Sequence, residues 1–129
     1  MKEKNMSDIK YTEDHEWIKI DGDTAWIGIT TYARHALGDL VFLELPENGR
    51  SLQKGEDFAV VESVKAASEI YTPVSGEIVA VNDNLADNID DLKEDIETGW
   101  IVKVKMSNPD EASALMDKQA YDSFTKNLG

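Results

Sequence analysis

The chain has 129 residues, a hydrophobic share of 41% and a formal net charge of −13, which together indicate one folded and strongly acidic domain. The sequence has no cysteine, which excludes a disulfide framework, a thiolate nucleophile and a cysteine-ligated metal. The excess of acids argues against nucleic-acid binding, because binding to a phosphate backbone depends on Lys and Arg.

The first half of the chain predicts short strands and one short helix. Apolar and polar residues alternate on both sides of Asp21-Gly22, a dipeptide that favours a tight hairpin turn, within residues 15–30. Thr30 is predicted to cap a helix over 31–37 that stops at Gly38. Further strands are predicted at 40–45, 58–64 and 69–71, separated by turns at 46–49 and 54–55.

The second half continues the β pattern and then becomes helical. Strands are predicted at 77–82 and 99–106, and the acidic stretch between them as a loop with a short helical piece at 89–93. Asn108 is predicted to cap a helix over 109–116, and a second helix follows over 117–127. Many short strands with helices at the end favour a small β barrel or sandwich.

Lys65 is the residue that the chain presents most clearly. It lies between two apolar strand segments and is followed by the small residues Ala66, Ala67 and Ser68. Small side chains beside a hairpin tip leave a lysine accessible to a modifying enzyme. Most surface lysines in turns are simply solvated, and composition alone does not choose between that interpretation and a modification site. A weak symmetry of strands and glycines about Lys65 suggests two similar β layers joined there.

The segment Val-Glu-Ser-Val-Lys-Ala-Ala-Ser at 61–68 resembles the lipoylation segment of glycine cleavage H proteins. Further blocks resemble that family in order and at family spacing: Tyr-Thr-Glu-Asp-His-Glu-Trp at 11–17, Ile-Gly-Ile-Thr at 27–30, Leu-Gly-Asp-Leu-Val-Phe-Leu-Glu-Leu-Pro at 37–46, Tyr-Thr-Pro-Val-Ser-Gly-Glu-Ile at 71–78, Asn-Asp-Asn-Leu-Ala-Asp at 82–87, Gly-Trp at 99–100 and Gln-Ala-Tyr at 119–121. The resemblance covers about residues 10–124.

The resemblance implies a mainly β, lipoyl/biotinyl-type barrel-sandwich hybrid with a short helix in its N-terminal half and helices at its C-terminus. It implies covalently bound lipoate on Lys65, at a hairpin tip. Glu62 and Gly76 are implied in recognition by the lipoylating enzyme, and Glu16 and Glu69 in a cleft for the aminomethyl-lipoyl arm. Biotin carriers flank their lysine with methionines, which this sequence lacks at 64 and 66.

The function implied is that of a carrier in the glycine cleavage system rather than an enzyme. The lipoyl group would shuttle the aminomethyl group of glycine from a pyridoxal-phosphate-dependent glycine decarboxylase (P protein) to a tetrahydrofolate-dependent aminomethyltransferase (T protein). Dihydrolipoyl dehydrogenase (L protein) would reoxidise it, and a lipoate ligase or octanoyltransferase would attach it. The large negative charge suits fast and transient docking to these partners.

Two alternatives remain open at the level of sequence. An H-like protein can serve as a lipoyl relay to 2-oxoacid dehydrogenases, or the chain can be an unmodified interaction module that retains the fold. The intact Glu62, Lys65 and Gly76 argue against the second. The segment 92–99 lacks the Asn…Pro-aromatic motif of the family, and Ala36 stands where some relatives carry histidine.

The remaining expectations concern setting and assembly. No apolar run has the length of a membrane span, and the polar start has neither a secretory core nor the arginines of a transit peptide. We therefore expect a cytoplasmic protein, or a mitochondrial matrix protein if the chain is a mature eukaryotic one. A monomer is favoured by charge repulsion, with one domain over 1–129 and a flexible extension at 1–8. His15 and His35 are too few for a zinc site, so no metal is expected.

Overall fold

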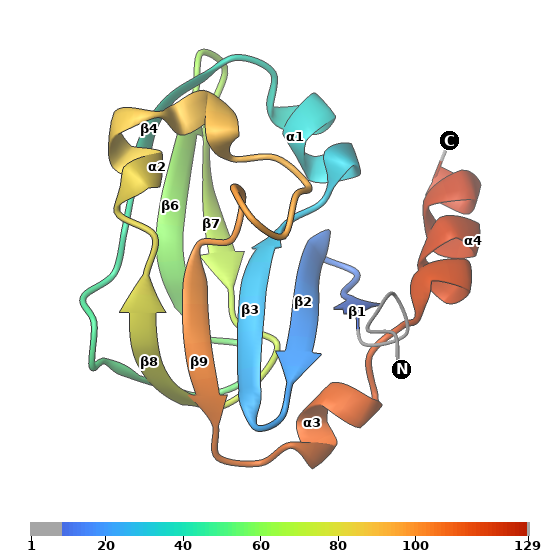
Figure 1. Ribbon diagram of the computed structural model, residues 1–129. Helices are drawn as coiled ribbons and strands as arrows, with labels where there is room; N and C mark the ends of the chain where they lie inside the picture. Colours follow the sequence, from blue (N-terminus) through green and yellow to red (C-terminus); the bar gives the residue numbers. More distant parts are fainter. Residues whose placement is uncertain (1–8, 129) are drawn as a thin grey trace.

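The computed structural model describes residues 9–128, which form two β-sheets packed against each other with helices at their margins (Figure 1). The predicted extension at 1–8 lies outside the described residues. In chain order the elements are β1 (Ile9–Tyr11), β2 (Glu16–Asp21), β3 (Thr24–Ile29), α1 (Thr31–Leu37), β4 (Leu40–Glu44), β5 (Ser51–Leu52), β6 (Asp57–Ser63), β7 (Ala67–Tyr71), β8 (Gly76–Val81), α2 (Asn84–Asp87), the 3-10 helix η2 (Ile89–Asp91), β9 (Val102–Met106), α3 (Asp110–Ser113) and α4 (Lys118–Leu128).

The larger sheet has six strands in the order β1-β2-β3-β9-β8-β5, and all its neighbours are antiparallel. The β2–β3 hairpin turns at Gly22, whose φ of 64° favours glycine, as the Asp-Gly dipeptide predicts. Sequence reasoning missed β1, because a strand of three residues is too short to show alternation. The strand predicted from Gly99 begins at Val102, since the Gly99 N–H donates to the Asp95 carbonyl and holds that residue in the preceding loop.

The smaller sheet has three antiparallel strands in the order β4-β6-β7. The hairpin at Lys65 therefore joins two strands of one sheet, and the idea of two similar layers joined there is wrong. The chain passes between the sheets instead in the connection from β3 through α1 to β4, in the connections on either side of β5, and between β7 and β8. As a result, the tip of the β6–β7 hairpin projects from one end of the molecule (Figure 1).

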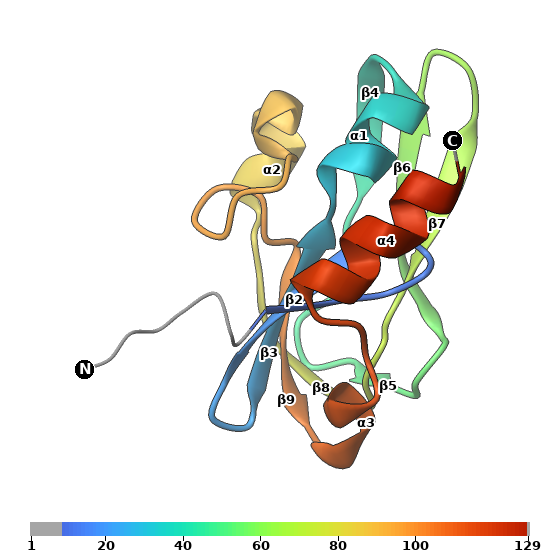
Figure 2. The ribbon, with the colours of Figure 1, turned by 90° about the vertical axis from the view of Figure 1, so that its right-hand side faces the viewer.

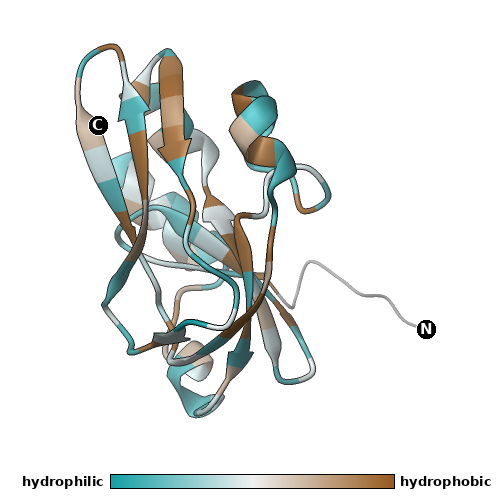
Figure 3. Cartoon of the chain, turned by 90° about the vertical axis from the view of Figure 1, so that its left-hand side faces the viewer, coloured by the Kyte–Doolittle hydropathy of each residue, from teal (hydrophilic) through white to brown (hydrophobic). Residues whose placement is uncertain are grey.

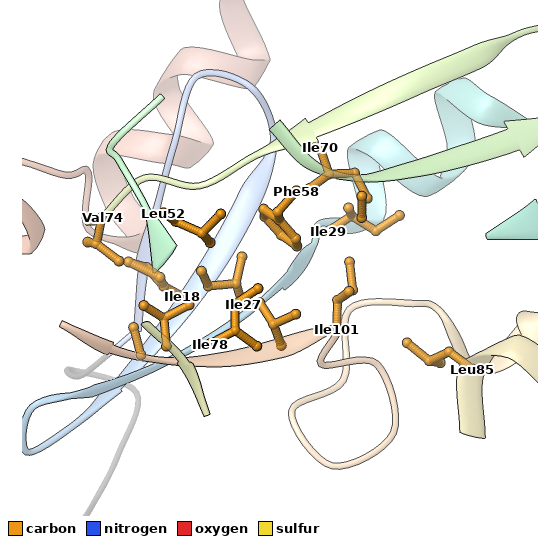
Figure 4. Close-up of a cluster of buried hydrophobic side chains, with 14 of the residues drawn as sticks. Ile18, Ile27, Ile29, Leu52, Phe58, Ile70, Val74, Ile78, Leu85 and Ile101 are labelled. Atoms are coloured by element: carbon orange, nitrogen blue, oxygen red, sulfur yellow. The ribbon is translucent and has the colours of Figure 1, made fainter. Parts of the chain in front are cut away.

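The core lies between the sheets. Phe58 and Ile70 of the smaller sheet point toward side chains of the larger sheet such as Ile27 and Ile78 (Figure 4). A continuous cluster of this kind is the main source of stability, since each fully buried aliphatic or phenyl side chain contributes about 1.5–3 kcal/mol. The core thus fixes the smaller sheet, and with it the base of the Lys65 hairpin. The predicted mainly β fold with helices at its end is confirmed, as two sheets without a closed barrel in residues 9–128.

The helices agree with the sequence in part. Helix α1 has its predicted bounds: the Thr30 hydroxyl accepts a hydrogen bond from the Ala33 N–H, and Gly38 follows with a φ of 79°. Helix α2 begins earlier than the predicted piece at 89–93, where η2 lies. The capping role predicted for Asn108 is wrong, because the cap is Pro109 and no side chain bonds to the first turn of α3. Helix α4 packs beside α1 and against β1 (Figure 2). No helix within residues 9–128 is long and apolar enough to cross a membrane.

Candidate functional site

Lys65 lies in the turn between β6 and β7, and its side chain is exposed. Ser63 shapes this turn, because its hydroxyl accepts hydrogen bonds from the N–H groups of Lys65 and Ala66 at 3.2 Å each. The Ser63 N–H donates in turn to the Ala66 carbonyl at 2.8 Å. Serine favours such local bonds in turns. The hairpin tip is therefore a defined structure that presents the lysine.

The ammonium of Lys65 is directed toward α1. Its Nζ donates to the Ala36 carbonyl at 3.0 Å, in the last turn of that helix. The bond is exposed and is weak for that reason, because water competes for both groups. Lysine is thus held near α1 without being enclosed, and a modifying enzyme has access to its amine.

A cleft of about 160 Å³ lies beside this contact, between α1, the segment before β2, and β7. Its apolar lining includes Ala36, Leu37 and Ile70, and its polar lining includes Glu16 and Glu69. The structure therefore brings Glu16 and Glu69 to one cleft, as the resemblance implies. Because Ala36 lines the cleft and also binds the Lys65 ammonium, the lysine lies at the rim.

Glu16 is the most unusual residue of the cleft, because it is only 3% exposed and glutamate is rarely so fully buried. Its carboxylate accepts one hydrogen bond from the Thr12 hydroxyl and one from the Tyr71 N–H, both at 3.0 Å. Burial raises the pKa of Glu16 to about 7, against the smaller opposing effects of these two hydrogen bonds. Near neutral pH this carboxyl group exchanges between its neutral and charged forms.

Glu69 differs from Glu16 because it is exposed at the edge of the smaller sheet. The Tyr71 hydroxyl donates to its carboxylate at 2.9 Å, and this bond, together with the nearby charge, raises the pKa of Tyr71. Tyr71 thus contacts both acids, Glu16 through its backbone and Glu69 through its side chain. Sequence reasoning missed this link, because the N–H of a strand residue has no signature in sequence.

A second group of side chains supports the cleft from the direction of α4. The Tyr121 hydroxyl lies 2.9 Å from Nδ1 of His15 and 2.7 Å from the Thr30 hydroxyl. His15 adopts a φ of 69°, which is rare outside glycine, and its ring stacks on Tyr32 at 4.2 Å between centroids. Desolvation lowers the pKa of His15. This network joins α4 to the residue before Glu16 and to the start of α1, so it fixes two walls of the cleft.

The two other predicted residues lie apart from the cleft. Glu62 is exposed on β6, with Phe42 of β4 and Ala67 of β7 as its register partners, three residues before Lys65. Gly76 begins β8 in the other sheet, paired with Leu52 and Met106. A Cβ at Gly76 would overlap the carbonyl oxygen of Lys105, so this glycine is required for close packing of β8 on β9. The structure does not bring Gly76 to the Lys65 hairpin.

No group of three His, Asp or Glu side chains in residues 9–128 is arranged to hold a metal ion. His35 is exposed on α1, as a surface residue would be. Trp17 is buried in a second cluster with Ile9, Tyr11 and Tyr121, while Trp26 and Trp100 pack at its margin. The tryptophans therefore have a structural role.

Comparisons with known proteins agree with this geometry. Residues 9–128 match the protein family described as Glycine cleavage H-protein. The chain is 53% identical over 125 residues to the glycine cleavage system H protein of Rhodospirillum rubrum, with 95% of this chain and 99% of that protein covered. It is 52% identical over 124 residues to that of Paramagnetospirillum magneticum, with the same coverage.

Similarity extends to a solved structure. The crystal structure of a glycine cleavage system H protein from Mycobacterium marinum superposes with a TM-score of 0.82 at 37% identity, covering 93% of this chain and 98% of that one. The chain belongs to the glycine cleavage H-protein family.

Proposed function

We propose that this protein is a lipoyl carrier of the glycine cleavage system, with the lipoyl group attached to Lys65. The observation that carries the proposal is the position of Lys65, exposed at a defined hairpin tip and at the rim of a cleft with a buried acid. Family membership supports it, because the matched relatives are H proteins of that system. The chain would be a substrate of its partner enzymes and not an enzyme itself.

The residues present fit a lipoyl arm. Lipoylation converts the Lys65 ammonium to a neutral amide, so the weak bond to the Ala36 carbonyl no longer depends on charge. The cleft then offers Leu37 and Ile70 to the hydrocarbon and the ring of the arm, and carboxylates to any amine at its end. When bound, the dithiolane of lipoate supplies the sulfur chemistry that a chain without cysteine lacks.

Glu16 is suited to distinguish a loaded arm from an empty one. With a pKa of about 7, its carboxyl is easily neutral when nothing charged lies in the cleft. An ammonium brought into the cleft favours the carboxylate, because opposite charges attract strongly where water is scarce. Entry of a cationic arm therefore shifts Glu16 toward its charged form, while an uncharged arm leaves it exchanging between its neutral and charged forms near neutral pH. The exposed Glu69 adds a second negative charge at the mouth.

In finer detail, the carrier would receive its aminomethyl cargo from the glycine decarboxylase and deliver it to the aminomethyltransferase. Dihydrolipoyl dehydrogenase would then restore the disulfide of the arm. Each contact must be brief, and exposed charges meet that need because they speed encounter without burying much surface. The net charge of −13 predicts that the partner surfaces which meet this chain are basic.

The proposal is tested with the lipoylated chain, a bacterial glycine decarboxylase and glycine labelled in its carboxyl carbon. We expect release of labelled carbon dioxide that depends on the lipoylated chain and saturates with its concentration. The control is Lys65→Arg, which retains the positive charge and cannot be lipoylated. Lipoylated wild type that supports no more release than Lys65→Arg would exclude a role in glycine cleavage and leave a lipoyl relay.

A further inference from the structure

The face of the β6–β7 hairpin away from the core carries exposed apolar residues. Within residues 9–128, Val41 is 56% exposed, Phe42 is 52% exposed and Val64 is 68% exposed. All three belong to the hairpin or to β4, its neighbour in the smaller sheet, and the Val64 N–H donates to the Asp39 carbonyl at 3.0 Å. Apolar residues therefore gather on the strands that present Lys65.

An irregularity in β4 creates this exposure. The register between β4 and β6 shifts between Leu40 and Phe42, and Leu40 and Leu43 are both buried. In a regular strand, side chains alternate between the two faces, so two consecutive residues do not both point outward. The bulge turns Val41 and Phe42 outward together, and the hydrophobic colouring of β4 beside the hairpin is visible in Figure 3. Bulges of this kind commonly re-aim side chains for recognition.

Carboxylates border the apolar residues. Phe42 lies directly opposite Glu62 in the register, so their side chains share one face of the sheet. Glu44 and Glu69 both lie opposite Val60 on that face, and all three glutamates are exposed. A partner for this surface needs an apolar centre and Lys or Arg at its margin. A second copy of the chain does not meet that description, because its charge of −13 has the same sign.

We infer that the outer face of the smaller sheet, formed by Val41, Phe42, Val64 and the flanking Glu44 and Glu62, is the docking surface for the enzyme that attaches the lipoyl group to Lys65. This inference rests on the proposed function. The cleft lies on the other side of the lysine, between α1 and β7, and is reserved for the arm once it is attached. An enzyme that must reach the free amine has the outer face as its point of contact.

The attachment itself needs nothing further from this chain than a free amine. The Lys65 ammonium leaves the Ala36 carbonyl and gives one proton to solvent, and the resulting amine nitrogen forms a bond with the acyl carbon of a lipoyl donor that the enzyme has activated. The nitrogen gives a second proton to solvent as the amide forms. The bond from that carbon to the leaving group breaks, and the leaving group departs with the electron pair. The outer face contributes to affinity and not to this step, so its loss raises KM and leaves kcat nearly unchanged.

The test uses the full chain with a bacterial lipoate ligase, lipoate and ATP, and follows initial rates by intact mass. The variants are Val41→Ser and Phe42→Ser. The matched control is Val79→Ser, because Val79 is 43% exposed on β8 of the other sheet, also beside a register shift. We expect KM to rise about tenfold in Val41→Ser and Phe42→Ser, as at the centre of an interface, and to change less than twofold in Val79→Ser. Thermal unfolding establishes that the variants are folded, and Val41→Ser decides the question alone if Phe42→Ser is unstable.

Each other outcome contradicts a distinct claim. Equal rates for Val41→Ser, Phe42→Ser and Val79→Ser, with wild type modified on Lys65, would overturn the docking surface and leave the carrier function intact. Wild type that the ligase does not modify would overturn both. A concentration-dependent dimer in sedimentation that Phe42→Ser dissociates would assign the surface to a second copy. Slower delivery to the aminomethyltransferase with unchanged lipoylation would assign it to that enzyme instead.

Discussion

The two sides of the Lys65 hairpin differ in how they treat acidic side chains. On the cleft side, Glu16 is buried and receives two hydrogen bonds from fixed donors. On the outer side, Glu62 and Glu44 are exposed beside Phe42. A buried carboxyl responds to the charge of whatever enters the cleft, whereas exposed carboxylates act at longer range on approaching partners. This difference is the basis for our two proposals, that the cleft side retains the arm and that the outer side binds a partner enzyme.

The contrast between the buried Glu16 and the exposed Glu62 should have its largest effect on how folding stability depends on pH. The ordinary pKa of glutamate is 4.5 and that of Glu16 is about 7, so the folded state holds this proton more tightly than the unfolded state. The folded state therefore loses stability as pH rises from 4.5 to 7, by about 3 kcal/mol from this group. Denaturant unfolding of wild type and Glu16→Gln at pH 4.5 and pH 8 measures it. We expect a loss larger by about 3 kcal/mol in wild type, and Glu62→Gln should behave as wild type.

The next largest effect should come from the network that supports the cleft. Tyr121→Phe removes a hydroxyl that lies within hydrogen-bond distance of His15 and Thr30, and leaves those partners unsatisfied. We expect the free energy of unfolding to fall by about 2 kcal/mol. Tyr32→Phe is the control, because Tyr32 is exposed and contributes its ring to the stack on His15. The rate of lipoylation should be unchanged in both variants, because the network does not touch the outer face. A slower rate in Tyr121→Phe would show that the cleft side and the outer side of the hairpin are coupled.

The lifetime of the loaded arm tests the role of the cleft independently of the outer face. We expect a loaded arm to lose its one-carbon unit to water about tenfold faster in Glu16→Gln than in wild type, because a buried charge is weakly screened. Glu69→Gln should have a smaller effect, since Glu69 is exposed. The measurement follows release of formaldehyde from the loaded carrier in the absence of the aminomethyltransferase. Equal lifetimes in wild type and Glu16→Gln would show that Glu16 does not protect the loaded arm from water.

Salt should have the smallest of these effects, and it should act on docking to the partner enzymes and not on the cleft. Raising ionic strength from about 0.05 to 0.5 M shortens the screening length to a few Å, so we expect kcat/KM with the partner enzymes to fall about threefold. The lifetime of the loaded arm should hardly change over the same range, because Glu16 is buried and interactions of buried charges are weakly screened. Partner rates that are insensitive to salt would show that the acidity of the chain serves solubility alone.

The comparison also explains what the sequence predicts and what it does not. The bounds of α1 follow from local signals, since Thr30 and Gly38 act within a few positions. Lys65 as an attachment site follows from the resemblance and not from the residues around it. The resemblance placed Glu16 and Glu69 together, and the structure brings both to one cleft. The bulge at Val41 escaped prediction, because two outward apolar residues in an apolar run look like an ordinary buried strand.

Other features depend on contacts that are distant in sequence. The contact of Tyr121 with His15 spans 106 positions in the sequence, and no local pattern predicts it. The resemblance links Gly76 to enzyme recognition, which stays a prediction, and its surroundings show in addition a packing requirement against Lys105. The shift of β9 to begin at Val102 arises from the loop bond between Gly99 and Asp95. Tertiary contacts determine such details, and the alternation of apolar and polar residues does not predict them.

The most direct test of the central claim is the intact mass of the chain after incubation with lipoate, ATP and a lipoate ligase, followed by peptide mapping. We predict one lipoyl increment, located on Lys65 and absent from Lys65→Arg. An increment on another lysine, or an unmodified chain under conditions where a known lipoyl domain is fully modified, would contradict the account.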